Sequence, residues 1–330
     1  ASAAAGRRII LRVVSRKNIH VPQIFSGLKR SQLGEKDLFL PLLAVYVAFF
    51  WPFRRVGLGT LECMSEFSKI SEWPADNIAG ALLHRGEIVE SVGALDRAFS
   101  VASVTKPVVA YGVAMAVEEG AVDLDMPAGP EGSTLRHLLA HASGVKFDSR
   151  EQQKPVGERR IYSSAGYEWA AEVVEKATEM PFPEYLREGV FAPLGMGSTR
   201  LEGSAGHGLV TTVSDLAAFT AEVYSPQLLH PGTVAEMRRV QFPGLRGIVP
   251  GYGSFKDCAW GLGFEIHGEK RQWMGALPSS AVGHFGMSGT YLWLAGDWAM
   301  VALTDRDFGD WAKLLWAEAN TAIWKECQAR

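Results

Sequence analysis

A serine and a lysine three positions apart, Ser103 and Lys106 in the stretch SVTK, are the residues of this chain best suited to chemistry. A neutral lysine amine can take the proton of a serine hydroxyl, which makes the serine oxygen a nucleophile toward a carbonyl carbon. The same S-x-x-K pattern also occurs at Ser26–Lys29 and Ser143–Lys146. Of the three, only the pattern at 103–106 opens a long apolar helical segment, so it is the one that predicts an activated nucleophile.

Pro107 indicates where the helix carrying this pair begins. A proline deep in a helix loses a hydrogen bond and clashes with the carbonyl four residues back, so it is tolerated only in the first turn. The helix is therefore predicted to begin near Ser103, with Lys106 one turn later on the same face. The positive end of the helix favours a neutral amine there. A capping serine beside a solvated lysine is the alternative, and this segment alone leaves both open.

Two later segments offer a second proton carrier and a docking edge for a substrate. Tyr162 precedes a predicted helix, with Ser163 and Ser164 as candidate N-caps, and it could shuttle a proton if nearby cations lower its pKa. His284 lies between glycines, ahead of a strand, in AVGHFGMSGT. Glycines weaken a strand unless something must approach its backbone closely, and a bound substrate would do so. Each residue taken alone could equally be structural.

The elements that must position these residues follow from hydrophobic patterns. Residues 61–71 have helical spacing, 78–93 form a hairpin around Arg85-Gly86, and 291–296 with 298–305 form a second strand pair. Short helical patterns and loops fill 121–280, and an amphipathic helix ends the chain. This order predicts an α+β fold: an antiparallel sheet built from both chain ends, flanked by helices, with an inserted, mostly helical lobe. The predicted domain spans 61–330, with the sheet lobe at about 61–120 and 281–330 and the helical lobe at about 121–280.

Composition separates residues 1–60 from this domain. They carry ten Lys or Arg against two acidic residues, although the whole chain has a net charge of −3. That balance argues against a nucleic-acid partner, and the first 60 residues are predicted to be a separate extension. The apolar run at 38–51 is 14 residues long, shorter than the roughly 20 that a spanning helix needs. Membrane association through residues 38–53 is the less favoured alternative. Three scattered cysteines favour a reducing, cytoplasmic location over an anchored or exported one.

Taken together, SVTK at 103–106, YSS at 162–164 and HFG at 284–286 resemble, in order, the motifs of the penicillin-recognising serine hydrolases. The chain is most similar to the group of class C β-lactamases, D,D-peptidases and β-lactamase-like esterases. LRHLLAHASG (135–144) and GLVTTVSDLAAF (208–219) resemble connecting segments of that family. The resemblance runs from about residue 70 to the C-terminus and implies a β-lactamase/transpeptidase-like fold.

The resemblance also implies roles for individual residues. Ser103 would be the acylated nucleophile, Lys106 its proton partner and Tyr162 an aid to proton transfer, and which of the last two is the base stays open. The backbone N–H groups of Ser103 and Met287 would form the oxyanion hole. The substrate-binding positions would be Ser164, His284 and Gly286.

Two departures from the family pattern affect the expected substrate. Ser164 stands where the family usually has an asparagine, and His284 stands where the lactamases commonly have a lysine. We therefore expect hydrolysis of a small-molecule ester or peptide amide, with weak or no β-lactamase activity. A charged His284 that binds a carboxylate would make activity vary between roughly pH 5.5 and 7.5. A catalytically silent sensor or scaffold with the same fold is the alternative.

Other chemistries have less support. The chain has no G-x-S-x-G motif of α/β-hydrolases and no G-x-G-x-x-G or P-loop pattern for nucleotides. His137 and His141 have the i, i+4 spacing of metal ligands but lack the H-E-x-x-H glutamate. No metal and no cofactor are expected.

Overall fold

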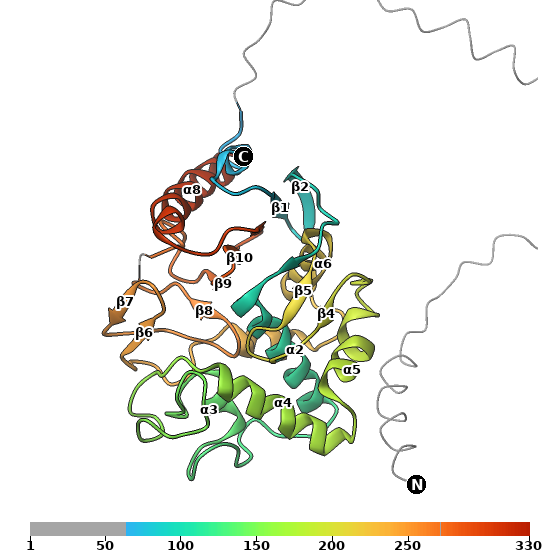
Figure 1. The fold of residues 1–330 in the computed structure, drawn as a ribbon, viewed down its shortest axis with the longest axis vertical. Helices are drawn as coiled ribbons and strands as arrows, with labels where there is room; N and C mark the ends of the chain where they lie inside the picture. Colours follow the sequence, from blue (N-terminus) through green and yellow to red (C-terminus); the bar gives the residue numbers. More distant parts are fainter. Residues whose placement is uncertain (1–63, 271) are drawn as a thin grey trace, which may run out of the picture. The chain divides into compact units, whose positions relative to one another are not determined.

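The main sheet takes its strands from both ends of the described chain. A computed structural model describes residues 64–270 and 272–330. Its largest sheet is antiparallel, with strand order β2-β1-β11-β10-β9-β8 (Figure 1). The strands are β1 (Ile78–His84), β2 (Glu87–Val92), β8 (Glu265–Ile266), β9 (Val282–Gly286), β10 (Thr290–Ala295) and β11 (Trp298–Thr304). The predicted α+β fold with an antiparallel sheet from both chain ends is therefore confirmed.

Both predicted strand pairs are hairpins with tight turns. Between β1 and β2, Arg85 (φ 53°) and Gly86 (φ 86°) both have left-handed backbones, the geometry of a two-residue hairpin turn. Between β10 and β11, Gly296 takes the left-handed conformation (φ 56°). The two hairpins lie side by side because β1 pairs with β11 from Ile78–Thr304 to His84–Trp298.

Each face of the sheet packs against its own set of helices. Leu82 and Met300 belong to a buried cluster with Trp316 of the C-terminal helix α8 (Asp310–Ala329). Their neighbours Leu83 and Val301 belong to a second cluster with helices α2 (Thr105–Glu118) and α6 (Val213–Tyr224). This division follows from the alternation of side chains along a strand.

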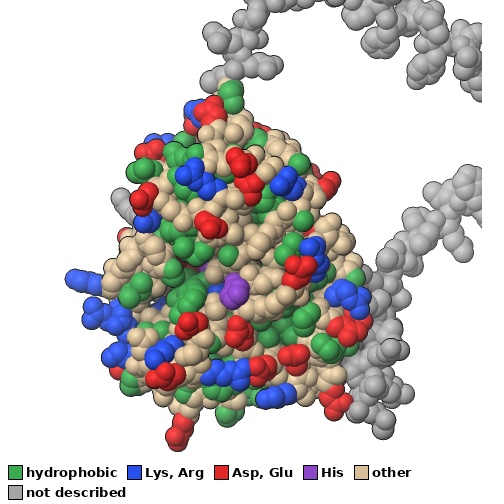
Figure 2. Space-filling model, viewed as in Figure 1, with side chains coloured by type: hydrophobic (Ala, Val, Ile, Leu, Met, Phe, Trp, Pro, Cys, Tyr) green, Lys and Arg blue, Asp and Glu red, His purple; other side chains and the backbone are tan. Residues whose placement is uncertain are grey.

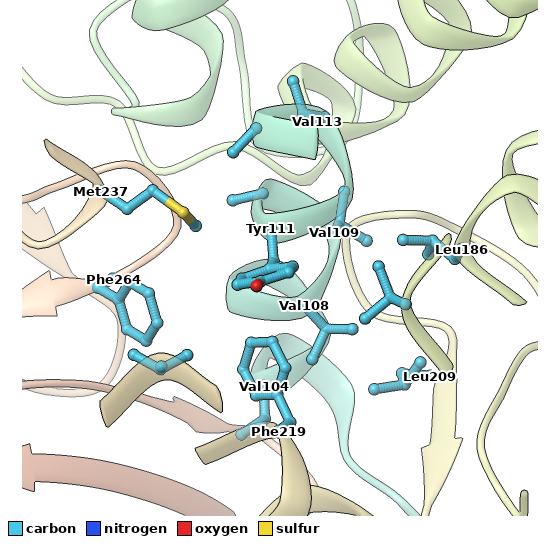
Figure 3. Close-up of a cluster of buried hydrophobic side chains, with 14 of the residues drawn as sticks. Val104, Val108, Val109, Tyr111, Val113, Leu186, Leu209, Phe219, Met237 and Phe264 are labelled. Carbon is cyan, nitrogen blue, oxygen red and sulfur yellow. The ribbon is translucent and has the colours of Figure 1, made fainter. Parts of the chain in front are cut away.

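Helix α2, which follows Ser103, runs through the centre of the larger cluster. Every residue from Thr105 to Ala116 is buried, so the helix is apolar all round rather than on one stripe. Figure 3 shows Val104, Val108 and Tyr111 enclosed by side chains from several other segments. The start of this helix is thus fixed by packing on all sides.

The remaining elements lie, along the sequence, between the strand pair β1–β2 and the strand pair β10–β11 of the main sheet. The helices among them are α3 (Leu135–Leu139), α4 (Ser164–Thr178), α5 (Phe182–Leu186), the π-helical turn η3 (Arg187–Phe191) and α7 (Pro231–Met237). Two small sheets accompany them, β3-β5-β4 and β6-β7. Their strands are β3 (Phe99–Ser100), β4 (Arg200–Leu201), β5 (Leu209–Thr211), β6 (Gly247–Val249) and β7 (Gly253–Phe255). The short strand β8 falls within the range 121–280 predicted to be mostly helical, yet it extends the main sheet.

The N-terminal predictions concern mostly residues outside the described part. The extension at 1–60 and the apolar run at 38–53 lie wholly within residues 1–63, so both stay predictions. Of the helix expected at 61–71, the structure describes a 3₁₀ helix, η1 (Ser68–Glu72). Within the described residues, no helix is both long and apolar enough to cross a membrane. Figure 2 shows basic and acidic side chains intermixed over the face in view.

Candidate active site

The segment around Ser103 is held at the junction of the small sheet and α2. Ser103 lies in a 3₁₀ turn, η2 (Ala102–Val104), that leads directly into α2. The preceding Ala102 has a left-handed backbone (φ 44°), a conformation that costs about 1–2 kcal/mol in an L-residue. Strand β5 ties this turn on both sides: Val101 N–H donates to the Leu209 carbonyl (3.1 Å), and Leu209 N–H donates to Thr105 Oγ1 (2.9 Å). The α-helix begins at Thr105, two residues after Ser103, in agreement with the prediction of a start near Ser103.

Lys106 is completely buried and lies against three oxygen atoms. Its Nζ is 3.1 Å from Ser103 Oγ, 3.2 Å from Ser164 Oγ and 2.7 Å from the Gly206 carbonyl oxygen. Burial lowers the pKa of Lys106 to about 7, and the Glu168 carboxylate opposes this lowering. Removal from water, rather than the helix end invoked from the sequence, is therefore what favours the neutral amine.

Tyr162 lies close to both Lys106 and strand β9. Its hydroxyl is 3.4 Å from His284 Nε2, and Lys106 Nζ lies 4.6 Å from the centre of its ring. Ser163 caps α4 by accepting a hydrogen bond from Gly166 N–H (2.9 Å), as the sequence predicted. Loss of water around the phenol raises the pKa of Tyr162, although a hydrogen bond with Ser103 opposes the rise. The condition set from the sequence, that nearby cations lower this pKa, is therefore not met, because desolvation raises it and the Glu265 charge adds to the rise.

His284 is a neutral, buried side chain of β9. Its ring is 2% exposed, and Nδ1 donates to the Phe285 carbonyl (2.7 Å), which leaves Nε2 as an acceptor. Burial and the charge of Lys106 lower the pKa of His284 to about 3. The expectation that His284 titrates between pH 5.5 and 7.5 is therefore wrong, because burial disfavours its charged form. The expected charged ring for a substrate carboxylate is wrong for the same reason.

The other predicted binding positions have different surroundings. Ser164 is buried at the start of α4, against Lys106. Gly286 packs on the nucleophile segment so closely that a Cβ there would lie 2.2 Å from the Val101 carbonyl oxygen. Met287 follows β9 with its side chain 49% exposed, and its carbonyl accepts a hydrogen bond from Phe308 N–H (2.8 Å). Three separate segments thus meet at the nucleophile turn: they carry Ser103 and Lys106, Tyr162 and Ser164, and His284 and Gly286.

A cavity of about 220 Å³ opens beside Ser103. Its walls are Ser103, Phe147, Tyr162, Pro250, Trp260, His284, Phe285 and Met287. Sequence reasoning missed Phe147, Pro250 and Trp260, which lie in loops without a motif. Because none of the eight is Lys, Arg, Asp or Glu, the cavity offers a ligand apolar contact and a few polar atoms but no fixed charge.

The ring of His141 packs against the ring of Tyr162. Its ring centre is 4.5 Å from that of Tyr162, and its Nδ1 accepts a hydrogen bond from Ser163 N–H (3.1 Å). His137, the other member of the candidate metal pair, instead contacts Thr134 Oγ1 (2.8 Å) and stacks on Phe242. Among residues 64–270 and 272–330, no group of three or more His, Cys, Asp or Glu could hold a metal ion.

The fold and the site define the class of protein. The chain matches the Beta-lactamase family model over residues 77–322 and belongs to that family. The prediction of a β-lactamase-related serine hydrolase is confirmed at this level.

A solved structure of a β-lactamase from Mycobacterium bovis is 43% identical, covers 79% of this chain and 99% of its own, and has a TM-score of 0.78. EstCE1, a hydrolase with promiscuous acyltransferase activity, shares the fold at 16% identity over 78% of this chain and 96% of its own (TM-score 0.63). Penicillin-binding protein 4* of Bacillus subtilis is 31% identical over 136 residues, 31% of this chain and 30% of that protein. The chain matches only about a third of the length of its curated relatives, 30% and 38%.

Proposed function

We propose that the protein hydrolyses a neutral ester through an acyl-enzyme on Ser103, with Lys106 as the general base. The observation that carries the proposal is the environment of the lysine amine. A neutral amine has two N–H bonds and one lone pair. When the two N–H bonds point to the Gly206 carbonyl (2.7 Å) and Ser164 Oγ (3.2 Å), the lone pair is left for the proton of Ser103, 3.1 Å away. With a pKa of about 7, a large fraction of Lys106 is unprotonated at neutral pH.

The proposed reaction has two halves. Lys106 takes the hydroxyl proton as Ser103 Oγ attacks the ester carbonyl, and the oxyanion is held by the backbone N–H groups of Ser103 and Met287. The intermediate collapses when the C–O bond breaks and the alcohol leaves with the proton from Lys106. Water then attacks the acyl-enzyme, gives a proton to Lys106, and the acid is released as Ser103 regains its proton.

Tyr162 acts in this scheme as a neutral phenol. Because the pKa of Tyr162 is raised, the phenol stays protonated at neutral pH. Tyr162 therefore relays protons by hydrogen bonding and does not serve as the base. With His284 Nε2 available as an acceptor 3.4 Å away, the Tyr162 hydroxyl can turn between donors and acceptors during the two halves of the reaction.

The substrate class follows from the charge of the cavity. Penicillins and D-amino-acid peptides carry a carboxylate, and a carboxylate brought into an apolar site needs a cation or several donors. The cavity walls include no Lys or Arg, and His284 is neutral. Phe147, Trp260 and Phe285 instead favour an uncharged ester with apolar groups.

The test is intact-protein mass spectrometry with a p-nitrophenyl acyl ester and, separately, a penicillin, on the wild-type protein and Ser103→Ala. We expect the ester to release nitrophenol and to label Ser103 transiently, with turnover lower by several orders of magnitude in the variant. Labelling by penicillin alone would overturn the choice of an ester. Unchanged turnover in Ser103→Ala, or no adduct and no product with either compound, would overturn the proposed function and favour a silent scaffold.

A further inference from the structure

The loop whose Gly206 carbonyl contacts Lys106 is tightly closed on itself. Residues 202–208 connect β4 to β5, and two backbone hydrogen bonds close them: Gly208 N–H to the Ser204 carbonyl (2.7 Å) and Glu202 N–H to the Gly208 carbonyl (3.0 Å). A Cβ at Gly208 would lie 2.8 Å from the backbone of Gly203. The loop therefore has little freedom to move its carbonyl groups independently.

The same loop packs against the first turn of α4. A Cβ at Gly206 would lie 2.6 Å from Ser164 Cβ, so the loop fills the space beside this serine. The Gly206 carbonyl then accepts the shortest of the three hydrogen bonds at Lys106 Nζ, 2.7 Å. The direction of the amine depends on this carbonyl.

A side-chain pair fixes the loop from the outside. Ser204 Oγ accepts a hydrogen bond from Gly206 N–H (3.0 Å) and donates one to Glu168, a half-buried residue one turn after Ser164 on α4. Glu168 thus connects α4 to the loop, and the loop connects to Lys106. None of these contacts involves the walls of the cavity.

We propose that Glu168 and Ser204 are positioning residues that hold the Gly206 carbonyl against Lys106 and thereby aim the amine at Ser103. The inference rests on the proposed role of Lys106 as base. It assigns a function to a carboxylate and a hydroxyl that touch neither substrate nor nucleophile.

Glu168 and Ser204 differ in charge, so their substitutions should have different effects. The ionisable groups around Lys106 are His141, Tyr162, Tyr167, Glu168 and His284. Burial lowers the pKa of both histidines, and the pKa of both tyrosines lies above its ordinary value of 10.0, so all four are uncharged near neutral pH. Glu168 therefore supplies the negative charge that raises the pKa of Lys106. Removing this charge should lower the pKa of the base, whereas removing the Ser204 hydroxyl should disturb only its direction.

The experiment measures the nitrophenol burst rate against pH for the wild type, Glu168→Gln and Ser204→Ala. Ser214→Ala is the matched control, because Ser214 Oγ also donates to a carboxylate, Asp96 (2.6 Å), away from the cavity walls. The burst rate should rise with pH as Lys106 loses its proton, and we call this rise the acid limb of the profile. We expect Glu168→Gln to shift the acid limb to lower pH by roughly half a unit or more. Ser204→Ala should lower the plateau about tenfold without moving the limb, and Ser204→Thr, which keeps a hydroxyl, should recover most of the rate.

Two results would overturn the inference: an acid limb in Glu168→Gln that coincides with the wild type, or a plateau in Ser204→Ala equal to that of Ser214→Ala. Melting temperatures of all variants show whether a lost rate reflects unfolding, and the isosteric Glu168→Gln keeps the test valid if Ser204→Ala does not fold. Ser103→Ala separates the two levels. If it abolishes the burst while Glu168→Gln and Ser204→Ala behave like the control, only the positioning role fails.

Discussion

Replacing Lys106 by methionine should abolish acylation and remove a pH-dependent loss of stability. In the unfolded chain the lysine has its ordinary pKa of 10.5, and in the folded protein burial lowers it to about 7. Between these two values the unfolded chain binds a proton that the folded protein does not, so stability rises with pH in this range. At pH 7 the buried lysine costs about 4 kcal/mol at 1.36 kcal/mol per pKa unit.

Methionine removes this cost and fills a similar volume. It also leaves the Gly206 carbonyl and the Ser164 hydroxyl without their donor, which costs about 1–3 kcal/mol for each group that stays unsatisfied. The two effects are similar in size at pH 7, so the free energy of unfolding should stay within about 2 kcal/mol of the wild-type value. Between pH 7 and pH 9 the wild type should gain about 2 kcal/mol from this group, and Lys106→Met should lack that gain.

The assay is urea unfolding of both proteins at pH 7 and pH 9, with nitrophenol release measured in parallel. Lys176→Met, on the exposed side of α4, controls for the loss of any lysine. Titrating groups that Lys106 does not affect contribute equally to both proteins, so the difference in slope reports Lys106 together with His141 and His284, whose pKa values its charge lowers. Parallel stability curves for the wild type and Lys106→Met would refute the claim that folding leaves this amine neutral.

Three further predictions concern other residues of the site. Tyr162→Phe should lower the acylation rate constant about 10²-fold without moving the acid limb of the burst profile, and a wild-type rate would remove the phenol from proton transfer. His284→Ala should leave the acid limb of activity near pH 7, because Lys106 sets it; loss of the limb in this variant would return the titration to His284. Gly286→Ala should cost about 2–4 kcal/mol, since its Cβ would lie 2.2 Å from a carbonyl oxygen. Its melting temperature should fall by several degrees relative to Gly197→Ala, where a Cβ meets nothing within 4 Å.

Most of the fold could be predicted from local sequence patterns. Arg85-Gly86 predicted a hairpin because few residue pairs adopt two consecutive left-handed conformations, and Pro107 predicted the helix start because it excludes any earlier turn. The order of the three motifs then predicted which segments meet. The extension of the main sheet by β8 gave no signal, because a two-residue strand has no measurable alternation.

Burial and its consequences for charge could not be predicted in the same way. The neutrality of His284 and the cause of the lowered pKa at Lys106 both depend on how much water the surrounding segments exclude. The Gly206 carbonyl meets Lys106 from a loop one hundred positions away, and carbonyl groups leave no mark in a sequence. Trp260 and Phe147 lacked a motif for the same reason: what makes them walls of a cavity is their neighbours.

The pairing of β1 with β11 also determines when the site can be completed during synthesis. Because Ile78 of β1 pairs with Thr304 of β11, β1 cannot take its place in the main sheet until β11 has been synthesised. Contacts between residues so distant in sequence form slowly. Until then β1 and β2 are a two-stranded hairpin, which has marginal stability in water. The nucleophile turn is synthesised early, but β9, which packs against it, belongs to an incomplete sheet until β11 has left the ribosome. A nascent or prematurely terminated chain would therefore carry Ser103 and Lys106 without the dry surroundings that make the amine a base, so reactivity would begin only when the sheet closes.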